Sequence, residues 1–314
     1  MPIIVAPSGV TPPPLTQLPD RSYASVTYYD PSGAAWPLTD QDAPQFALAD
    51  GISGIGAATY ELTKDAHPRG GSRLRHVQPL ERIITIPLLV QGADHSEFVT
   101  RWRALARAFT RTLREGAGTL EFARPDGSRR QIDVIYEGGF DTSGAAYSGI
   151  TSDTMAVSLY CPDPYWVDPV PQVVHREYSG VADDFFVPYP SISSGQVLGV
   201  TTVDNPGDID VWPVWDISGP ADAVDFTHAD SGEAFTLTPS AIGQALTVGE
   251  SVTVTTDPAS VRASDGSNWV GALNWPGAQL WALRPGLNNV SFVLSSSAAG
   301  SAVDLTYHPR YETA

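Results

Sequence analysis

Two pairs of neighbouring carboxylates, Asp183 with Asp184 and Asp208 with Asp210, have the residue type and the spacing for acid–base chemistry. A glycosidase uses two carboxyl groups a few ångströms apart in a cleft, one to protonate the leaving group and one to attack or to activate water. The sequence holds 35 acidic residues, so pairs of this kind arise by chance. We therefore predict that neither pair is catalytic.

Other patterns that could carry chemistry are incomplete. Asp204, Asp208 and Asp210 have the residue type of a calcium loop, but their spacing is not that of an EF-hand. Gly51–Gly56 is glycine-rich like a phosphate loop, yet no Lys-Ser/Thr follows it and no helical pattern begins there, which favours a loop attached to a strand. No Gly-x-Ser-x-Gly elbow occurs, and no metal-ligand spacing is found among the histidines, which are His67, His76, His95, His175, His228 and His308. The sequence predicts a protein that is not an enzyme and holds no metal or cofactor.

Length and composition indicate a globular protein of about two domains. The 314 residues suffice for two cores, and the hydrophobic fraction of 42% is ordinary for a folded chain. No apolar run approaches the roughly 18 residues of a membrane span and no signal-peptide pattern is present, so we expect a soluble protein. Cys161 is the only cysteine, which excludes an intrachain disulfide, and its place at the end of a strand pattern indicates a small core residue.

The net charge of −17 is unevenly distributed along the chain. Residues 64–130 hold 13 of the 18 basic residues and 7 acidic ones, whereas residues 157–314 hold 4 basic and 18 acidic residues. An acidic chain with one basic region is a poor candidate for general nucleic-acid binding. The asymmetry favours head-to-tail contact between copies.

The first half of the sequence predicts a sheet with one helix. Met1–Leu18 is rich in proline and predicts an extended arm. Arg82–Val90 is a continuous apolar run in which Pro87 indicates an edge position or a bulge, and His67–Ser72 indicates a loop. Alternating runs around turn residues predict two hairpins, Ser25–Tyr29 with Ala34–Leu38 and Thr119–Ala123 with Gln131–Tyr136.

One strong helical pattern follows Ser96, a favourable N-cap residue, and ends at Gly116 and Gly118. Its apolar residues recur at helical spacing and define one face, formed by Phe98, Trp102, Leu105, Phe109 and Leu113. The opposite face carries four arginines with almost no acidic partner in the helix, namely Arg103, Arg107, Arg111 and Arg114. This stripe is either a solvated face or a docking surface for an acidic neighbour.

The chain passes from one body to another within Ser158–Pro169. Thr154–Cys161 alternates as a strand, and three prolines after it forbid a continuous strand or helix. We therefore predict two domains, 1–166 and 167–314, joined by a hinge that comprises Pro162, Pro164, Tyr165 and Trp166. The two rings predict an aromatic pair packed onto a domain, with a stacking platform for a sugar or base as the alternative.

Beyond the hinge, short runs alternate between apolar and polar residues and are separated by turn residues, which predicts a β-sandwich. The apolar members of these runs include Val224, Phe226, Val252, Val254, Val290, Phe292, Leu294, Val303, Leu305 and Tyr307. Five tryptophans in this half are interpreted as core residues rather than ligand platforms, namely Trp212, Trp215, Trp269, Trp275 and Trp281. Gly207 and Gly286 are interpreted as turn residues.

Several segments in both halves carry a family resemblance. CPDPYW at Cys161–Trp166, NPGDIDVWPVWDISGP at Asn205–Pro220, and the closing runs LWALRPGLNNVSFVL and VDLTYHPRY together resemble the distal tail protein (Dit) family of long-tailed, siphovirus-type bacteriophages. The resemblance implies a mainly β fold. It places an N-terminal belt domain, a barrel-like sheet with one helix similar to the tail-tube fold, over 1–166, and a galectin-like β-sandwich over 167–314.

The resemblance also implies a structural hub at the distal end of the tail of the virion, present in the host cytoplasm before assembly. Six copies would form a ring that joins the tail tube to the tail-tip protein and leaves a channel for DNA in transit, without a membrane. Peripheral partners would be receptor-binding or glycan-binding proteins. The alternative is a carbohydrate-binding adhesin or receptor-binding tail component acting through the sandwich, although a fold alone does not establish that function.

Overall fold

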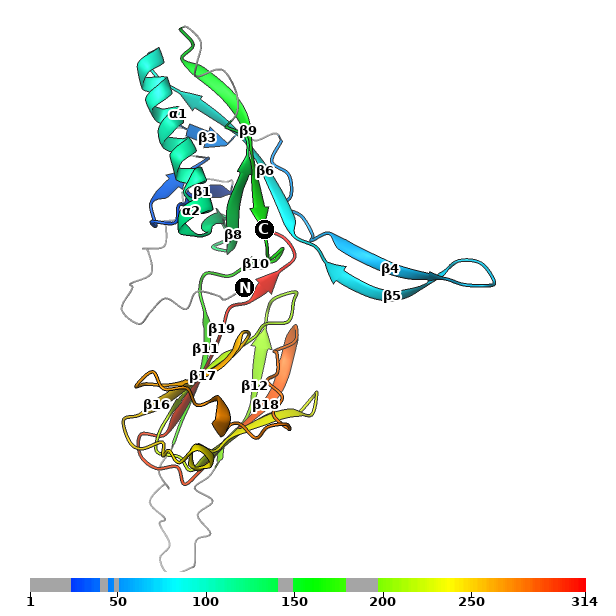
Figure 1. The fold of residues 1–314 in the computed structure, drawn as a ribbon, viewed down its shortest axis with the longest axis vertical. Coiled ribbons are helices and arrows are strands. Elements are labelled where there is room, and N and C mark those ends of the chain that lie inside the picture. The colour runs from blue at the N-terminus through cyan, green and yellow to red at the C-terminus, as the bar shows by residue number, and fades with distance from the viewer. Residues whose placement is uncertain (1–23, 40–44, 48–50, 141–148, 179–196) are drawn as a thin grey trace, which may run out of the picture. The chain divides into compact units, whose positions relative to one another are not determined.

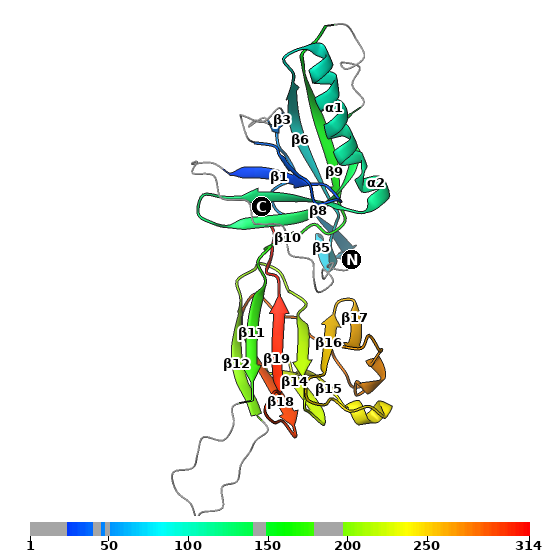
Figure 2. The ribbon, with the colours of Figure 1, turned by 90° about the vertical axis from the view of Figure 1, so that its left-hand side faces the viewer.

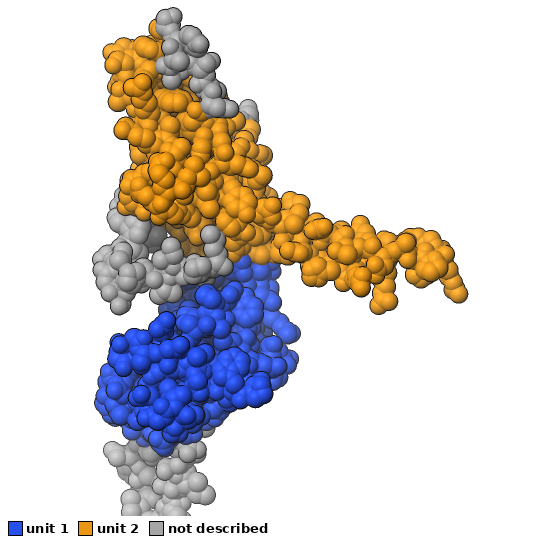
Figure 3. Space-filling view, in the orientation of Figure 1, with its two compact units in different colours: residues 1–5, 170–310 blue, residues 6–169, 311–314 orange. Residues whose placement is uncertain are grey.

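The computed structural model describes residues 24–39, 45–47, 51–140, 149–178 and 197–314. These residues divide into two compact units, shown in orange and blue in Figure 3. The first unit comprises the described residues of 24–169 together with 311–314, and the sandwich unit comprises those of 170–310. The predicted boundary lay between Trp166 and Val167 and assigned residues 311–314 to the sandwich. The structure places these last residues in the first unit instead, because they make long-range contacts there that no local pattern encodes.

The first unit is built on one large sheet with a long helix along it (Figures 1 and 2). In the described part of the chain this sheet has nine strands, with the order β2-β1-β7-β8-β9-β6-β3 and with β10 paired to β8 and β20. The elements of this unit are β1 (Ser25–Tyr29), β2 (Ala35–Pro37), β3 (Gln45–Ala47), β4 (Tyr60–Ala66), β5 (Ser72–Pro79), β6 (Arg82–Gln91), α1 (His95–Thr110), α2 (Thr112–Glu115), β7 (Gly118–Ala123), β8 (Arg129–Gly138), β9 (Ser152–Cys161) and β10 (Trp166–Val167), and β20 (Arg310–Tyr311) marks the return of the chain.

Helix α1 covers one face of this sheet. Its side chains Phe98, Leu105 and Phe109 are buried in a core shared with alternate residues of the strands. The ring of Tyr28 in β1 stacks on Phe109 with 4.2 Å between centroids, and its hydroxyl donates to the carbonyl of Ala108 at 3.1 Å. The helix is therefore fixed by both apolar packing and a buried hydrogen bond.

The start of α1 differs from the sequence prediction. Its N-cap is Asp94, whose carboxylate accepts a hydrogen bond from the backbone N–H of Glu97 at 2.8 Å. Ser96 lies inside the first turn, so its assignment as the N-cap was wrong. Asp and Ser are both favourable N-cap residues. Ser96 is nearer in sequence to the first apolar residue of the helix than Asp94, but this nearness does not make it the N-cap.

The end of the helical pattern also differs. Helix α1 ends at Thr110, and the short helix α2 follows with Thr112 as its buried residue. Leu113 is 57% exposed and does not belong to the apolar face, so that assignment was wrong. Gly116 ends α2 with a φ of 116°, as the glycine pattern predicts.

The predicted strands of this unit are present. The two predicted hairpins are β1–β2 and β7–β8, and β6 pairs with β9 along its whole length. Pro87 does not lie in an edge strand, because β6 is flanked by β9 and β3. The ladder to β3 spans Leu88–Val90, and Pro87 lies next to it. Its missing N–H therefore falls beside the described ladder rather than in it.

The sandwich unit consists of two antiparallel sheets. Their orders in the described residues are β11-β19-β13-β16-β17 and β12-β18-β14-β15. The strands are β11 (Gln172–Glu177), β12 (Val197–Asn205), β13 (Val214–Ser218), β14 (Ala223–His228), β15 (Glu233–Leu237), β16 (Ser251–Thr256), β17 (Ala259–Ala263), β18 (Gly286–Ser295) and β19 (Ala302–Tyr307). All ten apolar residues named for the predicted strand runs are buried, and the prediction of a mainly β fold with a C-terminal sandwich is confirmed.

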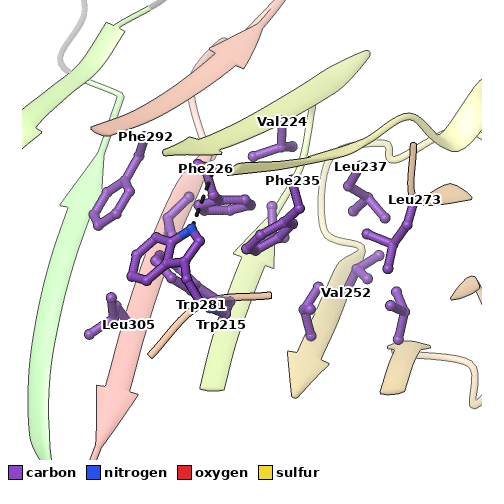
Figure 4. Packing of buried hydrophobic residues seen from close by; sticks show 14 of the residues in the cluster. Trp215, Val224, Phe226, Phe235, Leu237, Val252, Leu273, Trp281, Phe292 and Leu305 are labelled. Atoms are coloured by element: carbon purple, nitrogen blue, oxygen red, sulfur yellow. Dashed lines mark hydrogen bonds between the residues drawn. The ribbon is translucent and has the colours of Figure 1, made fainter. Parts of the chain in front are cut away.

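The core of the sandwich is centred on Trp215 (Figure 4). Its indole lies 4.8 Å from that of Trp281 and 4.5 Å from the ring of Phe226, measured between centroids. Trp269 is buried as well, whereas Trp212 is 39% and Trp275 is 53% exposed. The prediction that the tryptophans form core therefore holds for three of the five.

Candidate functional site

The side chains that could do chemistry are not gathered into one site. Over the described ranges, no group of three or more His, Cys, Asp and Glu side chains lies close enough to hold a metal ion. Asp183, Asp184 and the predicted arm Met1–Leu18 lie outside the described residues. Cys161 is fully buried, and burial raises the pKa of its thiol to about 12, as expected of a core residue.

The segment that carries Asp208 and Asp210 is organised by an amide rather than by these exposed carboxylates. Asn205 is buried, and its side chain donates to the carbonyls of Ile209 and Leu283, both at 3.1 Å. Gly207 is required there for space as well as for the turn, because a Cβ atom would lie 2.4 Å from the carbonyl oxygen of Arg310. The segment is a structural corner of the sandwich.

The β4–β5 hairpin projects from the rest of the first unit (Figures 1 and 3). It has an apolar face that nothing in the described part of this unit covers. The register pairs Leu62 with Val77 and Lys64 with Leu74, so these side chains share one face with Tyr60. We call Tyr60, Leu62, Leu74 and Val77 the hairpin face. The exposed fractions of Leu62, Leu74 and Val77 are 47%, 54% and 42%.

The opposite face of the hairpin is polar. It holds Glu61, Thr63, Asp65, Arg73, His76 and Gln78. Alternation of this kind is typical of a strand with one buried side, yet every residue of β4 and β5 is exposed. A two-stranded sheet is marginally stable by itself, and contiguous exposed apolar side chains mark interaction surfaces. The hairpin therefore has the composition of an element that is buried on one side by a partner.

The root of the hairpin is anchored by the buried side chain of Arg82. Its guanidinium donates to the carbonyls of Pro164 at 2.8 Å, Gly54 at 2.7 Å and Glu312 at 2.9 Å, and also to that of Gly56. Burial lowers the pKa of Arg82, and the four carbonyl oxygens replace the water that the cation has lost. One side chain thus joins the loop before β4, the connector after β9 and the segment 311–314.

Glu312 adds a second set of bonds at the same root. Its carboxylate accepts hydrogen bonds from the N–H of Ala58, at 3.0 Å, and from the hydroxyl of Tyr60. The hydroxyls of Tyr60 and Tyr165 lie 3.2 Å apart, and burial together with the bond to Glu312 raises the pKa of Tyr60. We call Arg82, Glu312, Tyr60 and Tyr165 the root node.

The glycine-rich loop Gly51–Gly56 is part of this root and is attached to a strand, as predicted. Ser53 pairs with Thr85 of β6. Gly54 has a φ of 82°, and a Cβ atom would lie 2.1 Å from the carbonyl oxygen of Ile83. The glycine is needed for close backbone approach, which explains the glycine pattern without a phosphate.

The predicted hinge residues precede the sandwich unit in sequence, and Tyr165 among them belongs to the root node. Trp166 is fully buried, and its ring is edge-on to that of Phe122 at 5.3 Å. Tyr165 is also buried, so the aromatic pair packs onto the first unit, and Pro164 is held through its carbonyl by Arg82. Movement at Pro162 and Pro164 stays a prediction.

The four arginines of the predicted stripe are not equivalent. Arg111 donates to Glu115 and, at 3.3 Å, to the buried carboxylate of Asp30, so its charge is used within the first unit. Burial alone would raise the pKa of Asp30, but hydrogen bonds from Ser32, Ala34 and Trp36 outweigh it and lower that pKa. Arg111 is therefore paired with acidic residues within the first unit, and its role at an interface stays a prediction.

Arg103, Arg107 and Arg114 are exposed and have no ion pair within the described ranges. Two open depressions flank this part of the helix. The Trp36 depression has a volume of 430 Å³ and is lined by Asp30, Trp36, Ala104, Arg107, Ala108, Arg111 and Arg114. The Trp102 depression has a volume of 490 Å³ and is lined by Thr100, Trp102, Arg103, Ala106, Arg107 and Thr110. Arg107 borders both.

Sequence reasoning missed the hairpin face and the root node. Around the predicted loop His67–Ser72, apolar and polar residues alternate on both sides, and this was the available signal for a hairpin. The role of Arg82 had no such signal, because its four acceptors are backbone carbonyls distant in sequence.

The fold defines the class of protein: it has two β units, and the first of them carries one long helix and an exposed hairpin. Neither a protein-family model nor a curated protein sequence matches the chain. The chain is similar in structure to the Dit protein (gp 19.1) of phage SPP1, described as a paradigm of the hub adsorption apparatus in phages that infect Gram-positive bacteria. The identity is 14% and the TM-score 0.64, over 92% of this chain and 99% of that one.

A second likeness is to the baseplate of phage P2 in its activated conformation with Ca. The identity is 10% and the TM-score 0.55, over 93% of this chain and 100% of that one. The same baseplate with Sr gives 11% identity and a TM-score of 0.51, over 91% and 98%. These likenesses span both units, so the fold is that of Dit-type hub and baseplate proteins. No helix in the described residues is long and apolar enough to cross a membrane.

Proposed function

We propose that this chain is the structural hub of a phage tail tip. Six copies form a closed ring at the distal end of the tail, which joins the last ring of the tail tube to the tail-tip protein and leaves a channel for DNA. The protein acts by interface area and pore shape and is not an enzyme. The observation that carries the proposal is the likeness of fold, over more than nine-tenths of the chain, to the Dit hub protein of phage SPP1.

The hairpin face supports assembly between copies. It exposes apolar side chains, and covering them with another surface would lower the free energy. A ring of identical copies with heterologous contacts supplies such a surface at every position and closes without free ends. Within the hairpin, Lys64 lies on the same face as Leu74 and is the only lysine of the chain, whose net charge is −17. Its cation suits contact with another copy of an acidic protein.

Electron microscopy of the purified protein tests the proposal. We expect six-fold rings with a central hole, and a mass of six chains by light scattering. Leu62→Ser/Leu74→Ser/Val77→Ser should abolish the rings, because it removes apolar area from the hairpin face without touching a core. The matched control Thr63→Ser/His76→Ser/Gln78→Ser changes three residues of the opposite face and should leave the rings intact. A monomer, or rings that persist in the first variant and are lost in the control, would contradict the proposal.

Cross-linking identifies the contact itself. A carbodiimide joins an amine to a carboxylate without a spacer, so in a ring it should link Lys64 of one copy to an acidic residue of the next. Lys64→Arg keeps the charge and removes the amine, and should eliminate that cross-link. An unchanged intermolecular cross-link in Lys64→Arg would place the contact elsewhere.

Carbohydrate binding through the sandwich unit is the second candidate. The exposed indole of Trp275 favours it, because an exposed aromatic ring offers a stacking surface for a sugar. A glycan array with the intact protein and with Trp275→Ala separates the two. Binding to a defined glycan that is lost in Trp275→Ala would support an adhesin, and equal signals from both proteins would exclude this ring as the site.

A further inference from the structure

Five arginines on α1 and its continuation divide into two groups by their partners. Arg101 pairs with Glu97 at 2.7 Å, and Arg111 pairs with Glu115 at 2.9 Å and with Asp30. The other group is left without an acidic partner in the described residues and comprises Arg103, Arg107 and Arg114. Three positive charges on one surface repel one another. Binding of an anion is therefore more favourable here than at a surface whose arginines are already paired with carboxylates.

The two depressions on either side of Arg107 have the same construction. Each is lined by alanine, one tryptophan and arginines, and the Trp36 depression also contains Asp30, whose carboxylate is paired with Arg111. The Trp36 depression uses Ala104 and Ala108, and the Trp102 depression uses Ala106. Alanine side chains are small and allow a polypeptide to approach the helix closely, and the tryptophans provide apolar contact beside the guanidinium groups.

The spacing of Arg103 and Arg107 along the helix matches the spacing of alternate side chains in an extended segment. Arg103 and Arg107 are one turn apart, a rise of about 6 Å along the helix. Side chains on the same side of an extended strand repeat at about 7 Å. Two carboxylates two residues apart in an extended segment therefore reach both guanidinium groups, each able to form the paired hydrogen bonds that arginine makes with carboxylate.

We propose that this surface of α1 binds an extended acidic segment of a partner protein, with carboxylates at alternate positions that contact Arg103 and Arg107 and a further carboxylate at Arg114. A protein segment suits the surface better than a nucleic acid. The net charge of −17 repels a long polyanion from the chain as a whole, whereas a short acidic segment interacts with the local cations alone. The proposal goes beyond the ring, since it concerns a separate surface from the hairpin face.

The test uses a fluorescein-labelled peptide of alternating Thr and Glu as the probe, with alternating Thr and Gln as its neutral counterpart. Fluorescence anisotropy should show binding of the acidic peptide that weakens as salt rises, and no binding of the neutral one. Arg103→Gln/Arg107→Gln/Arg114→Gln should weaken binding by about tenfold, as expected from three exposed pairs of modest strength. The control Arg124→Gln/Arg262→Gln/Arg284→Gln removes the same charge from other surfaces and should change affinity by less than about twofold.

A second variant guards against loss of fold in the first. Ala106→Glu leaves every arginine in place, keeps a good helix-forming residue and puts a negative charge in the lining of the Trp102 depression. It should also weaken binding of the acidic peptide. Equal weakening by the control triple, equal binding of the neutral peptide, or tighter binding of duplex DNA than of the acidic peptide at physiological salt would each overturn the proposal. Rings without peptide binding would leave the hub proposal standing and remove this one alone.

Discussion

Arg82 and Glu312 are 230 residues apart in sequence, yet the guanidinium Nη2 of Arg82 donates to the backbone carbonyl of Glu312 at 2.9 Å. This bond joins the first residue of β6 to the segment in which the chain returns from the sandwich unit. Because the same guanidinium also holds Gly54 and Pro164, it fixes the root of the hairpin and the connector in one position.

The first prediction concerns this guanidinium. Arg82→Lys should lower the free energy of unfolding of the protein by roughly 2 to 4 kcal/mol, because one ammonium group cannot satisfy four carbonyls and leaves buried acceptors unpaired. The matched control is Arg75→Lys, an exposed residue of the hairpin, which should change stability by less than about 0.5 kcal/mol. Denaturant titration followed by circular dichroism measures both. Equal stability of the two variants would show that the root node contributes little.

The second prediction separates close packing from backbone strain. Gly54 and Gly70 both have positive φ, of 82° and 93°, but only at Gly54 would a Cβ atom meet the backbone of another strand. Gly70→Ala should destabilise by about 1 kcal/mol from strain alone. Gly54→Ala should cost about 2 kcal/mol more, since Ile83 or the loop must move. Thermal unfolding of both variants measures the difference, and equal losses would mean that the loop moves freely.

The third prediction is that residues 170–310 fold without the first unit. Every residue of the apolar core around Trp215 lies within residues 203–307, so no part of that core is lost by excision. We expect a cooperative thermal transition and the blue-shifted fluorescence of buried indoles from Trp215, Trp269 and Trp281. A fragment that melts without cooperativity would show that the sandwich depends on the rest of the chain.

The fourth prediction concerns the edge strand β11. Nδ1 of His175 lies 2.6 Å from the carboxylate of Asp304 on β19, and Nε2 lies 3.7 Å from that of Glu177. The hydrogen bond to Asp304, aided by Glu177, raises the pKa of His175 above the ordinary value for histidine. The stabilisation is therefore fully present below the unfolded-state pKa of about 6.5 and is lost as pH rises through the folded-state pKa.

Titration of His175 by NMR checks this directly. Asp304→Asn should bring the pKa of His175 down toward the ordinary value and reduce the pH dependence of sandwich stability. Because the side chain of His175 is half-exposed, the effect on stability should be small. A pKa of His175 that is unchanged by Asp304→Asn would show that the pair does not persist in solution.

The sequence by itself determined the elements whose signal is local. Alternation fixed β9 and the strands of the sandwich, since a strand buried on one face must place apolar residues at every second position. Helical spacing fixed the inward face of α1, including Phe98 and Leu105. The arginine stripe could also be located, because charged residues on the outer face of a helix are visible in the same period.

Only the tertiary structure decided which of these residues have a partner and which are buried. Arg107 and Arg111 belong to the same stripe of the helix, but Asp30 comes beside Arg111 alone, from a hairpin 81 residues away. Likewise, Tyr60 and Leu62 have the pattern of a half-buried strand, and the fold leaves them exposed. Local sequence encodes backbone conformation and polarity, whereas partners and burial depend on which distant segments the packing of the sheet brings together.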